Sequence, residues 1–402
     1  MESNAQERLK EGQIVQVQIG PVAHGGHFVA RYNGQVIFVR HGITDELVNI
    51  KITSVSSKIA HADVVEVLQP ATSRVSPPCQ YAGSCGGCDF QHINPAYQRQ
   101  LKADVIKEQF SRIAKMPIEV EVEEVSKSTH WRTRAIATTN RNGKLGFYKS
   151  RSHTVVPVTD CLICVDTMEL KSLAASHLKG DMRVEVSASN TGERTIALAP
   201  TRGEEKARIS EGPVVLHENV LGKVLEVNQA SFWQSNEKAP EVLTQTVLDF
   251  AKLKNGEHVL DLYGGVGLFT AAIVDAIGTT GHVDLIEGSK VATADASRNF
   301  AGKNNVHIHT GDVARLITRF SQADVIVLDP PREGAGKDVI THCAQLKPRT
   351  IVYVACDPAA LARDTGYLRD AGYQLESMRA FDLFPMTHHI ESVAKFVPSK
   401  VS

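Results

Sequence analysis

The stretch Val259-Leu-Asp-Leu-Tyr-Gly-Gly-Val-Gly-Leu-Phe269 decides the fold of the C-terminal part of this chain. It begins as a short apolar run, passes through glycines and continues as Thr270-Ala-Ala-Ile-Val-Asp-Ala-Ile277, which is the order of a strand, a tight turn and a helix. Gly265 and Gly267 would let the backbone turn sharply and approach a ligand closely. The stretch therefore predicts the opening unit of a nucleotide-binding α/β sheet.

A carboxylate at a suitable distance supports a ligand at this turn. Glu287 ends the next apolar run, residues 283–287, about twenty residues past the glycines, where it can hold ribose hydroxyls. A dinucleotide fingerprint would have a third glycine at position 270, where this chain has Thr270. The glycine pair alone is equally compatible with an ordinary turn, but together with Glu287 it favours S-adenosylmethionine over a nicotinamide cofactor.

The rest of the C-terminal section alternates predicted strands and helices. Strands are expected at residues 306–312, 323–329 and 350–355, with a closing pair near 378–381 and 393–397. This alternation predicts a mainly parallel, doubly wound sheet that binds ligands beyond the carboxyl ends of its strands. Asp312 follows the third strand, where it could meet an adenine amino group, although a lone aspartate there is more often a helix cap.

Bulk properties limit the classes of protein to consider. A length of 402 residues suits two or three domains, and the seven cysteines, with no secretion signal at the polar start Met1-Glu-Ser-Asn-Ala-Gln, favour a reducing, cytoplasmic location. No apolar run reaches membrane-spanning length, so we expect no membrane partner. Because the net charge is −1, nucleic-acid binding would need a local patch. Residues 130–159 offer one, with six basic side chains and no acid: Arg132, Arg134, Arg141, Lys144, Lys149 and Arg151.

Residues 5–70 are predicted to form a small β-barrel. Five short runs, at 14–19, 26–31, 35–39, 46–52 and 62–67, are separated by glycines and polar turns. The turn Ala23-His-Gly-Gly-His-Phe-Val-Ala and the run into Arg74-Val-Ser-Pro-Pro-Cys resemble a TRAM domain, which binds RNA in certain RNA-modifying enzymes. A generic barrel that positions other domains is the alternative.

A cysteine group follows the barrel. Cys79, Cys85 and Cys88 stand at C-x5-C-x2-C spacing among glycines, and Cys161 or Cys164 could supply a fourth thiolate. Such a set suits structural zinc or an iron–sulfur cluster. Next, residues 97–115 have helical periodicity, and a strand-rich stretch from 118 to about 227, with runs at 121–125, 183–187, 195–199 and 213–216, is expected to form a central sheet. We therefore expect a cluster-bearing central domain at 71–227 and a cofactor-binding domain at 228–402.

Polar motifs lie at or near the strand ends of the last domain. Asp329-Pro-Pro-Arg332 follows the fourth strand, Cys356-Asp-Pro358 follows the fifth, and Glu391 follows Phe384-Pro-Met-Thr-His-His-Ile. Phe232-Trp-Gln-Ser-Asn236 lies just upstream of the sheet. Taken alone, a cysteine at a strand end usually belongs to the core, and Cys343 is interpreted that way. His388 and His389 could assist proton transfer, but packing or capping is the preferred interpretation of both.

Together these motifs resemble the iron–sulfur-containing RNA 5-methyluridine methyltransferase family, S-adenosylmethionine enzymes that act on uridine in ribosomal or transfer RNA. The likeness covers nearly the whole chain. It implies an α/β class I methyltransferase domain behind an N-terminal barrel and a β-rich iron–sulfur domain. By this resemblance, Cys356 is the nucleophile and Glu391 the base. Four thiolates would hold a [4Fe-4S] cluster: Cys79, Cys85, Cys88 and Cys161. Cofactor or base would be contacted by Gln234, Tyr263, Glu287 and Asp329.

The chain departs from the family pattern at three positions. Gly264 replaces a frequent cysteine, which should affect only packing, and Leu268 stands where relatives often have a polar side chain that could bond the cofactor. Asp357 replaces the usual asparagine after the nucleophile. A carboxylate beside Cys356 should raise the pKa of its thiol.

The chemistry explains the residue types. Carbon 5 of uracil is a poor nucleophile, so a thiolate must first add to carbon 6. A carboxylate must then remove the proton from carbon 5. Asp329 and Gln234 could fix the uracil edge, Phe232 could stack on the base, and Arg132 and Arg134 could contact an unstacked RNA strand.

We thus expect a monomeric RNA (uracil-C5)-methyltransferase that uses S-adenosylmethionine, binds cofactor also through Gly265, Gly267 and Asp312, and prefers 23S ribosomal RNA over transfer RNA. A non-catalytic RNA-binding protein is one alternative. A zinc-containing enzyme that methylates another acceptor, such as cytosine, is the other.

Overall fold

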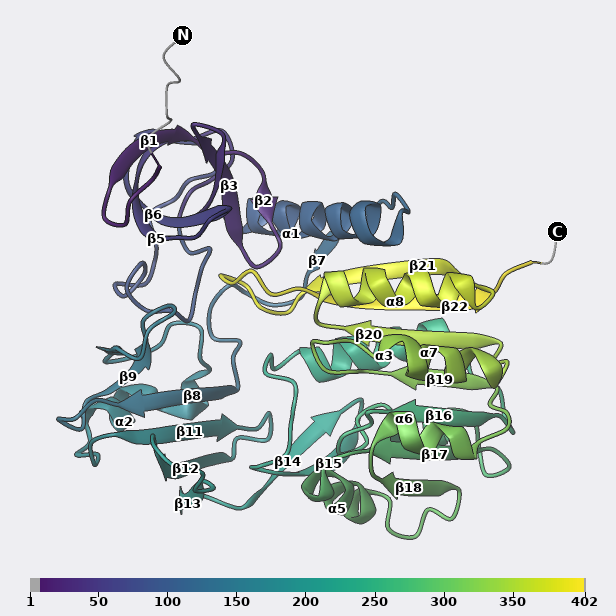
Figure 1. The fold of residues 1–402 in the computed structure, drawn as a ribbon. Coiled ribbons are helices and arrows are strands. Elements are labelled where there is room, and N and C mark those ends of the chain that lie inside the picture. The colour runs from purple at the N-terminus through teal and green to yellow at the C-terminus, as the bar shows by residue number, and fades with distance from the viewer. Residues whose placement is uncertain (1–7, 401–402) are drawn as a thin grey trace.

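The computed structural model describes residues 8–400, so the polar start at residues 1–6 lies outside the described part of the chain. A β-barrel, a central sheet and a large C-terminal sheet succeed one another along the chain (Figure 1). Within the described residues, no helix is both long and apolar enough to span a bilayer.

The N-terminal barrel has the five predicted strands and one short addition. They are β1 (Ile14–Gln18), β2 (Val22–Ala23), β3 (His27–Tyr32), β4 (Gln35–Arg40), β5 (Leu47–Val55) and β6 (Ile59–Gln69), in the order β1-β5-β6-β4-β3-β2. Alternate residues such as Val15, Phe28 and Ile50 fill the interior. Buried Glu46 accepts a hydrogen bond of 2.6 Å from Nε of Arg74, which fastens the segment that leaves the barrel.

The predicted helix at 97–115 is confirmed, and it packs on the C-terminal sheet. It comprises α1 (Pro95–Gln109) and a π-helical turn (Phe110–Ala114), whose buried face includes Ala103, Ile106 and Phe110. Lys102, also buried, donates to Oδ1 of Asp382 over 2.6 Å. A buried ion pair this short ties the helix to the far end of the chain.

The strand expected at 121–125 forms, but its placement in the central sheet is wrong. Its structured part, β7 (Val122–Glu124), pairs in parallel with β21 (Tyr373–Asp382) at the edge of the C-terminal sheet. The reason is that α1 packs on that sheet and delivers the following segment to its open edge.

The central sheet consists of β10 (Val155–Pro157), β9 (Leu145–Tyr148), β8 (Arg134–Thr139), β11 (Met182–Ala188), β12 (Arg194–Pro200) and β13 (Arg208–Glu211) in that order, with α2 (Leu170–Ala175) against it. The run at 213–216 was predicted here, which is also wrong. It begins β14 (Val215–Val220), which pairs only with β15 (Lys223–Asn228) as a separate hairpin beside α5 (Lys290–Asn299).

The C-terminal sheet has the predicted doubly wound form. Its order is β18-β17-β16-β19-β20-β22-β21-β7. The strands are β16 (His258–Leu262), β17 (His282–Glu287), β18 (Val306–Thr310), β19 (Val325–Leu328), β20 (Thr350–Ala355), β21 and β22 (Glu391–Pro398). The other helices are α3 (Ala239–Ala251), α4 (Thr270–Ala276), α6 (Val313–Leu316), α7 (Gly336–Gln345) and α8 (Pro358–Asp370). Strands β16 to β20 run parallel, and β22 is antiparallel to β20.

Candidate active site and cysteine pocket

Two chemically active side chains are brought together by the pairing of β20 with β22. Ala355, the last residue of β20, is opposite Ser392, so Cys356 just beyond it lies across from Glu391, the first residue of β22. Strand order thus places a thiol and a carboxyl at the same edge of the sheet, although 34 positions of sequence (357–390) separate them. Backbone hydrogen bonds of the sheet hold this juxtaposition.

Burial controls the ionisation of both groups. Desolvation, helped by the charges of Glu391 and Asp329, raises the pKa of Cys356 to about 12, while Arg332 acts in the opposite direction. Asp357 adds to the rise, as its position next to the thiol predicts, but less than burial does. Burial and the neighbouring Asp329 raise the pKa of Glu391 well above its usual range. In the free protein the thiol is therefore protonated at neutral pH.

The barrel reaches into the cavity that contains Cys356. This cavity, of about 130 Å³, is lined by Cys356, Asp357 and Arg332 from the C-terminal sheet and by His24, Gly25 and Gly26 from the loop between β2 and β3. Nε2 of His24 is 2.8 Å from Oδ2 of Asp357. That hydrogen bond raises the pKa of His24, and although burial opposes ionisation of Asp357, the contact with His24 lowers the pKa of the carboxyl. The pair therefore favours a charged contact between barrel and catalytic loop.

Glycine is required where the barrel loop meets the catalytic domain. At Gly26, with φ of +77°, an added Cβ would lie 2.5 Å from Cβ of His388. His388 is itself held by Asp89, 2.6 Å from its Nδ1, in the segment that leaves the barrel. His388 thus packs against Gly26 and bonds Asp89, and burial lowers the pKa of its neighbour His389 to about 3.

A second cavity lies beside the glycine turn. It is lined by Phe232, Gln234, Tyr263, Gly265 and Asp329, which come from three segments of the chain. Nε2 of Gln234 donates to Oδ2 of Asp329 over 3.3 Å. Burial, with a smaller effect of Asp261, raises the pKa of Asp329 to about 7. Five of the residues predicted to contact cofactor or base therefore meet at one cavity.

The glycines of the turn have separate roles. An added Cβ at Gly265, with φ of +57°, would face open space, so that residue leaves room for a ligand while its N–H donates to Oε2 of Glu287 over 3.1 Å. At Gly267 a Cβ would lie 2.2 Å from Phe300, so packing forbids one. Thr270 replaces the third glycine because its hydroxyl and its N–H both donate to buried Asp261.

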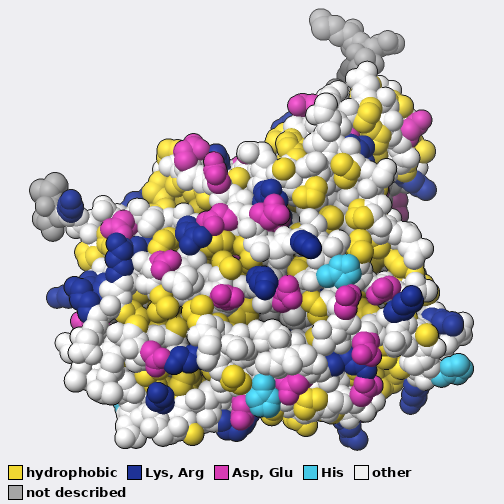
Figure 2. Space-filling view, turned by 180° about the vertical axis from the view of Figure 1, so that it is seen from behind, with side chains coloured by type: hydrophobic (Ala, Val, Ile, Leu, Met, Phe, Trp, Pro, Cys, Tyr) yellow, Lys and Arg dark blue, Asp and Glu magenta, His cyan; other side chains and the backbone are white. Residues whose placement is uncertain are grey.

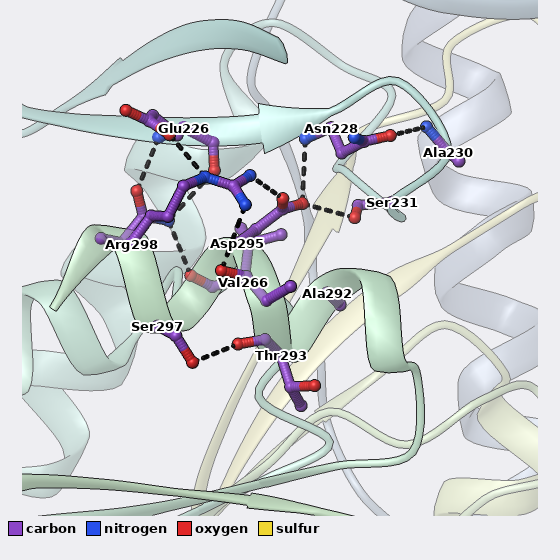
Figure 3. Close-up of polar contacts among 12 residues, drawn as sticks. Glu226, Asn228, Ala230, Ser231, Val266, Ala292, Thr293, Asp295, Ser297 and Arg298 are labelled. Atoms are coloured by element: carbon purple, nitrogen blue, oxygen red, sulfur yellow. Dashed lines mark hydrogen bonds and ion pairs between the residues drawn. The ribbon is translucent and has the colours of Figure 1, made fainter. Parts of the chain in front are cut away.

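Helix α5 anchors both walls of this cavity (Figure 3). Oδ2 of Asp295 accepts hydrogen bonds from the backbone N–H of Asn228, at 2.9 Å, and the hydroxyl of Ser231, at 2.5 Å. On the next turn, Nδ2 of Asn299 donates to the carbonyl of Val266 over 3.0 Å. The helix therefore fixes the segment before Phe232 and the glycine turn relative to each other.

Beside Phe232 lies a wide groove, which Arg132 and Arg134 also line. The Phe232 ring is 72% exposed, an unusual cost for an aromatic side chain without a partner. Nε and Nη2 of Arg134 and Nε of Arg132 are buried with no hydrogen-bond acceptor among the described residues. An exposed ring in a groove lined by two arginines suits a splayed nucleotide.

Five cysteines line one pocket between the loops that follow the barrel and the central sheet. These are Cys79, Cys85, Cys88, Cys161 and Cys164, with Arg132 beside them. Cys161 is half-buried and Cys164 is in the core, and a hydrogen bond from Cys164 lowers the pKa of Cys161 to about 7. Burial raises the pKa of Cys88 to about 12. The donor set fits a thiophilic metal group, and Cys161 is the more accessible of the two possible fourth ligands.

Two of the predicted cofactor contacts, Asp312 and Glu287, do not line the cofactor cavity. Asp312 caps α6, accepting a hydrogen bond of 2.9 Å from the N–H of Arg315, and it does not line the cofactor cavity. Glu287 meets the glycine turn through Gly265 but does not line that cavity either. His24 was not predicted as a site residue. The Gly-rich turn that contains it was recognised, but nothing in the sequence shows which domain that turn faces.

Comparison with known proteins gives two family matches. Residues 204–396 match the model described as tRNA (Uracil-5-)-methyltransferase, and residues 8–65 match the TRAM domain. The second match agrees with the barrel predicted from the sequence.

Two relatives match along nearly their whole length. An RNA methyltransferase of Streptomyces avermitilis is 38% identical over 428 residues, covering 96% of this chain and 99% of the relative. Another, from Streptomyces coelicolor, is 37% identical, covering 96% and 93%. Among solved structures, the Pyrococcus abyssi tRNA (uracil-54, C5)-methyltransferase in complex with S-adenosyl-L-homocysteine matches with a TM-score of 0.75 and 20% identity, covering 95% of this chain and 99% of that one. At that identity the likeness concerns the fold.

Proposed function

This chain belongs to the RNA (uracil-5-)-methyltransferase family, S-adenosylmethionine-dependent enzymes here joined to a TRAM domain, and on that premise we propose that it methylates uridine through a covalent adduct at Cys356. The observation that carries the proposal is the pairing that sets Cys356 across from Glu391 at the edge of the sheet. A non-catalytic RNA-binding protein would have no need for a buried thiol and carboxyl at that point.

In the proposed reaction, Cys356 loses its proton to water and its thiolate adds to carbon 6 of the uracil, which gives an enolate with a nucleophilic carbon 5. When bound, S-adenosylmethionine would supply the methyl group to carbon 5 and leave as S-adenosylhomocysteine. The raised pKa of Cys356 means that substrate must favour the thiolate, and Arg332, which lowers this pKa, is suited to assist.

Glu391 completes the cycle. As a carboxylate it takes the proton from carbon 5, the electron pair forms the carbon 5–carbon 6 double bond, and the thiolate of Cys356 leaves. A carboxyl whose pKa is raised by burial is a strong base once it is ionised, which fits this step. The Gln234–Asp329 pair would bind the uracil edge or the cofactor from the neighbouring cavity.

The cysteine pocket is proposed to hold a [4Fe-4S] cluster on Cys79, Cys85, Cys88 and Cys161. Four thiolates around a single zinc ion, with Zn–S bonds of about 2.3 Å, would place their sulfurs roughly 3.8 Å apart. An all-cysteine set of four suits a [4Fe-4S] cluster, with structural zinc as the alternative. Arg132 lines both this pocket and the groove beside Phe232, so the cluster would act by positioning RNA rather than by redox chemistry.

The proposed substrate is 23S ribosomal RNA, gripped by the barrel and by the groove with Phe232, Arg132 and Arg134. Basic and acidic side chains are interspersed over most of the face seen in Figure 2. Transfer RNA is the alternative substrate. Nucleoside mass spectrometry of the RNA from a deletion strain would identify the RNA that loses 5-methyluridine.

The covalent step is tested with RNA that contains 5-fluorouridine. Fluorine cannot be removed as a proton, so the enzyme with S-adenosylmethionine should form a stable protein–RNA crosslink that Cys356→Ala abolishes. Normal methylation by Cys356→Ala, or no crosslink with the wild-type protein, would refute the mechanism. Iron removal that left the protein folded and RNA-bound but unable to form the crosslink would refute the positioning role of the cluster.

A further inference from the structure

Four polar side chains, Asp284 among them, gather in the C-terminal sheet, and two of them, His258 and His282, begin their strands at the edge away from Cys356 and the glycine turn. They come from three neighbouring strands, β16, β17 and β18 (Figure 1). His258 is paired with His282 in the register of β16 and β17, and Asp284 lies two residues further along β17. Because side chains alternate along a strand, His282 and Asp284 point to the same face. His309 of β18 reaches the same carboxylate.

The distances within the group converge on one carboxylate. Oδ2 of Asp284 lies 2.8 Å from Nε2 of His258 and 4.0 Å from Nε2 of His282. All three atoms lie within 4.8 Å of one another. The other oxygen, Oδ1, lies 2.6 Å from Nε2 of His309. Asp284 is thus held on one side by His309 and faces two imidazoles on the other.

The two imidazole rings lie side by side. The rings of His258 and His282 are stacked, with centroids 4.0 Å apart and planes 16° apart. Stacking of this kind places one nitrogen of each ring close to the carboxylate of Asp284.

An ordinary ion pair does not account for His282. Its Nε2 is too far from Asp284 for a hydrogen bond, yet its ring is stacked beside one that has such a bond. The side chain is 44% exposed, so an ion can enter from solvent. Nitrogen and oxygen ligands in this combination are typical of zinc, and a histidine on the second carboxylate oxygen is the kind of outer partner that orients a metal ligand.

We propose that His258, His282 and Asp284 bind one divalent transition-metal ion, with Zn²⁺ as the best match, and that His309 orients the carboxylate. The ion fastens β16 to β17, and through His309 it also steadies the edge strand β18. This site is separate from the cysteine pocket and independent of the methyl-transfer reaction.

The test is a titration of the full-length protein, with its cysteine pocket intact, with Zn²⁺. Binding is measured by isothermal titration calorimetry, and stability is measured by thermal unfolding with and without Zn²⁺. Wild-type protein should bind one more equivalent of Zn²⁺ than the His282→Ala variant. Zn²⁺ should also raise the unfolding temperature of the wild-type protein by more than that of the variant. Affinity at this site should fall at least 100-fold in His282→Ala and roughly 10-fold in His309→Ala, on the scale by which outer partners change metal affinity.

His217→Ala is the matched control. His217 is 45% exposed and lies 2.9 Å from Oε1 of Glu193, so it is a similar histidine–carboxylate pair without the second imidazole on that carboxylate. The control should bind Zn²⁺ like wild type. Equal stoichiometry and affinity in wild type and His282→Ala, or no Zn²⁺ bound by the wild-type protein at this site, would overturn the proposal. His282 is only partly buried, and circular dichroism verifies that the His282→Ala variant is folded.

Discussion

The catalytic cavity and the cysteine pocket are built in different ways. Cys356 and Glu391 stand at the ends of two strands whose pairing fixes their relative position. The pocket cysteines come from loops, Cys79 to Cys88 after the barrel and Cys161 with Cys164 before α2. A site at sheet ends keeps its geometry without a ligand, whereas a site on loops depends on the group it holds. Substitutions in the catalytic cavity should therefore lower the rate of methylation with little effect on the free energy of unfolding. Substitutions in the cysteine pocket should mainly lower the free energy of unfolding.

The largest effect on rate is expected from Glu391→Gln. Without a base at this position the methylated adduct cannot release its proton, so turnover should fall about 10²- to 10⁴-fold. Covalent protein–RNA adduct should accumulate on denaturing gels with unmodified RNA. Glu376→Gln, on the exposed side of the Lys395 ion pair, is the control and should turn over normally. A variant that lost activity by unfolding, as seen by calorimetry, would contradict the distinction between the two sites.

The largest effect on stability is expected from Cys88→Ala. A group that binds the folded protein at a concentration of about 100 to 1,000 times its dissociation constant stabilises it by about 3–4 kcal/mol. Loss of the cluster should therefore reduce the free energy of unfolding by about that amount. Iron content, measured by mass spectrometry, should fall with it. Cys164→Ala leaves the four proposed ligands in place and should retain iron. Loss of iron in Cys164→Ala but not in Cys161→Ala would show that Cys164, and not Cys161, is the fourth ligand.

A smaller effect is expected where the barrel meets the catalytic cavity. Gly26→Ala should lower the free energy of unfolding by about 1–3 kcal/mol because the added Cβ would overlap His388. Hydrogen exchange in residues 22–26 should rise, and KM for RNA should rise with it. Gly25→Ala is the control that separates backbone strain from steric overlap. Gly25 also has a positive φ, but an added Cβ there would lie 3.8 Å from its nearest neighbour and would not overlap it. Equal effects in the two variants would mean that backbone strain alone is responsible.

The smallest effect is the pH dependence of the His24–Asp357 contact. The raised pKa of His24 means that its contribution is fully present below its ordinary value of 6.5 and is lost as pH rises through the raised value. The lowered pKa of Asp357 means that its contribution is present above 3.8 and is lost as pH falls through the lowered value. Since His24 is 41% exposed, the contact is worth less than about 1 kcal/mol.

Protection of the loop that contains His24 against hydrogen exchange, corrected for the intrinsic rise of exchange with pH, should therefore fall as pH rises through the raised pKa of His24. The His24→Gln variant should lack this dependence. An unchanged pH profile in that variant would show that another group controls the loop.

The elements of the C-terminal domain could be predicted because long apolar runs alternate with helical periods and end in polar motifs. The motifs identified the chemistry, including Cys356 and Glu391, through resemblance. Their spatial pairing could not be predicted, because it depends on β22 lying between β20 and β21. The three-residue β7, with two glutamates, carries no signal for its partner strand. The contact of His24 with Asp357 depends on how two domains dock, which local sequence does not encode.

The edge pairing of β7 has a consequence for synthesis on the ribosome. Residues 122–124 emerge long before residues 380–382, their partners in β21. Until the last segment is translated, the apolar face of α1, with Ile106 and Phe110, has no complete sheet to cover it. Nascent chains halted before residue 380 should therefore attract chaperones, and α1 with β7 should become protease-resistant only after β21 has been translated, whereas the barrel can fold earlier around its own core.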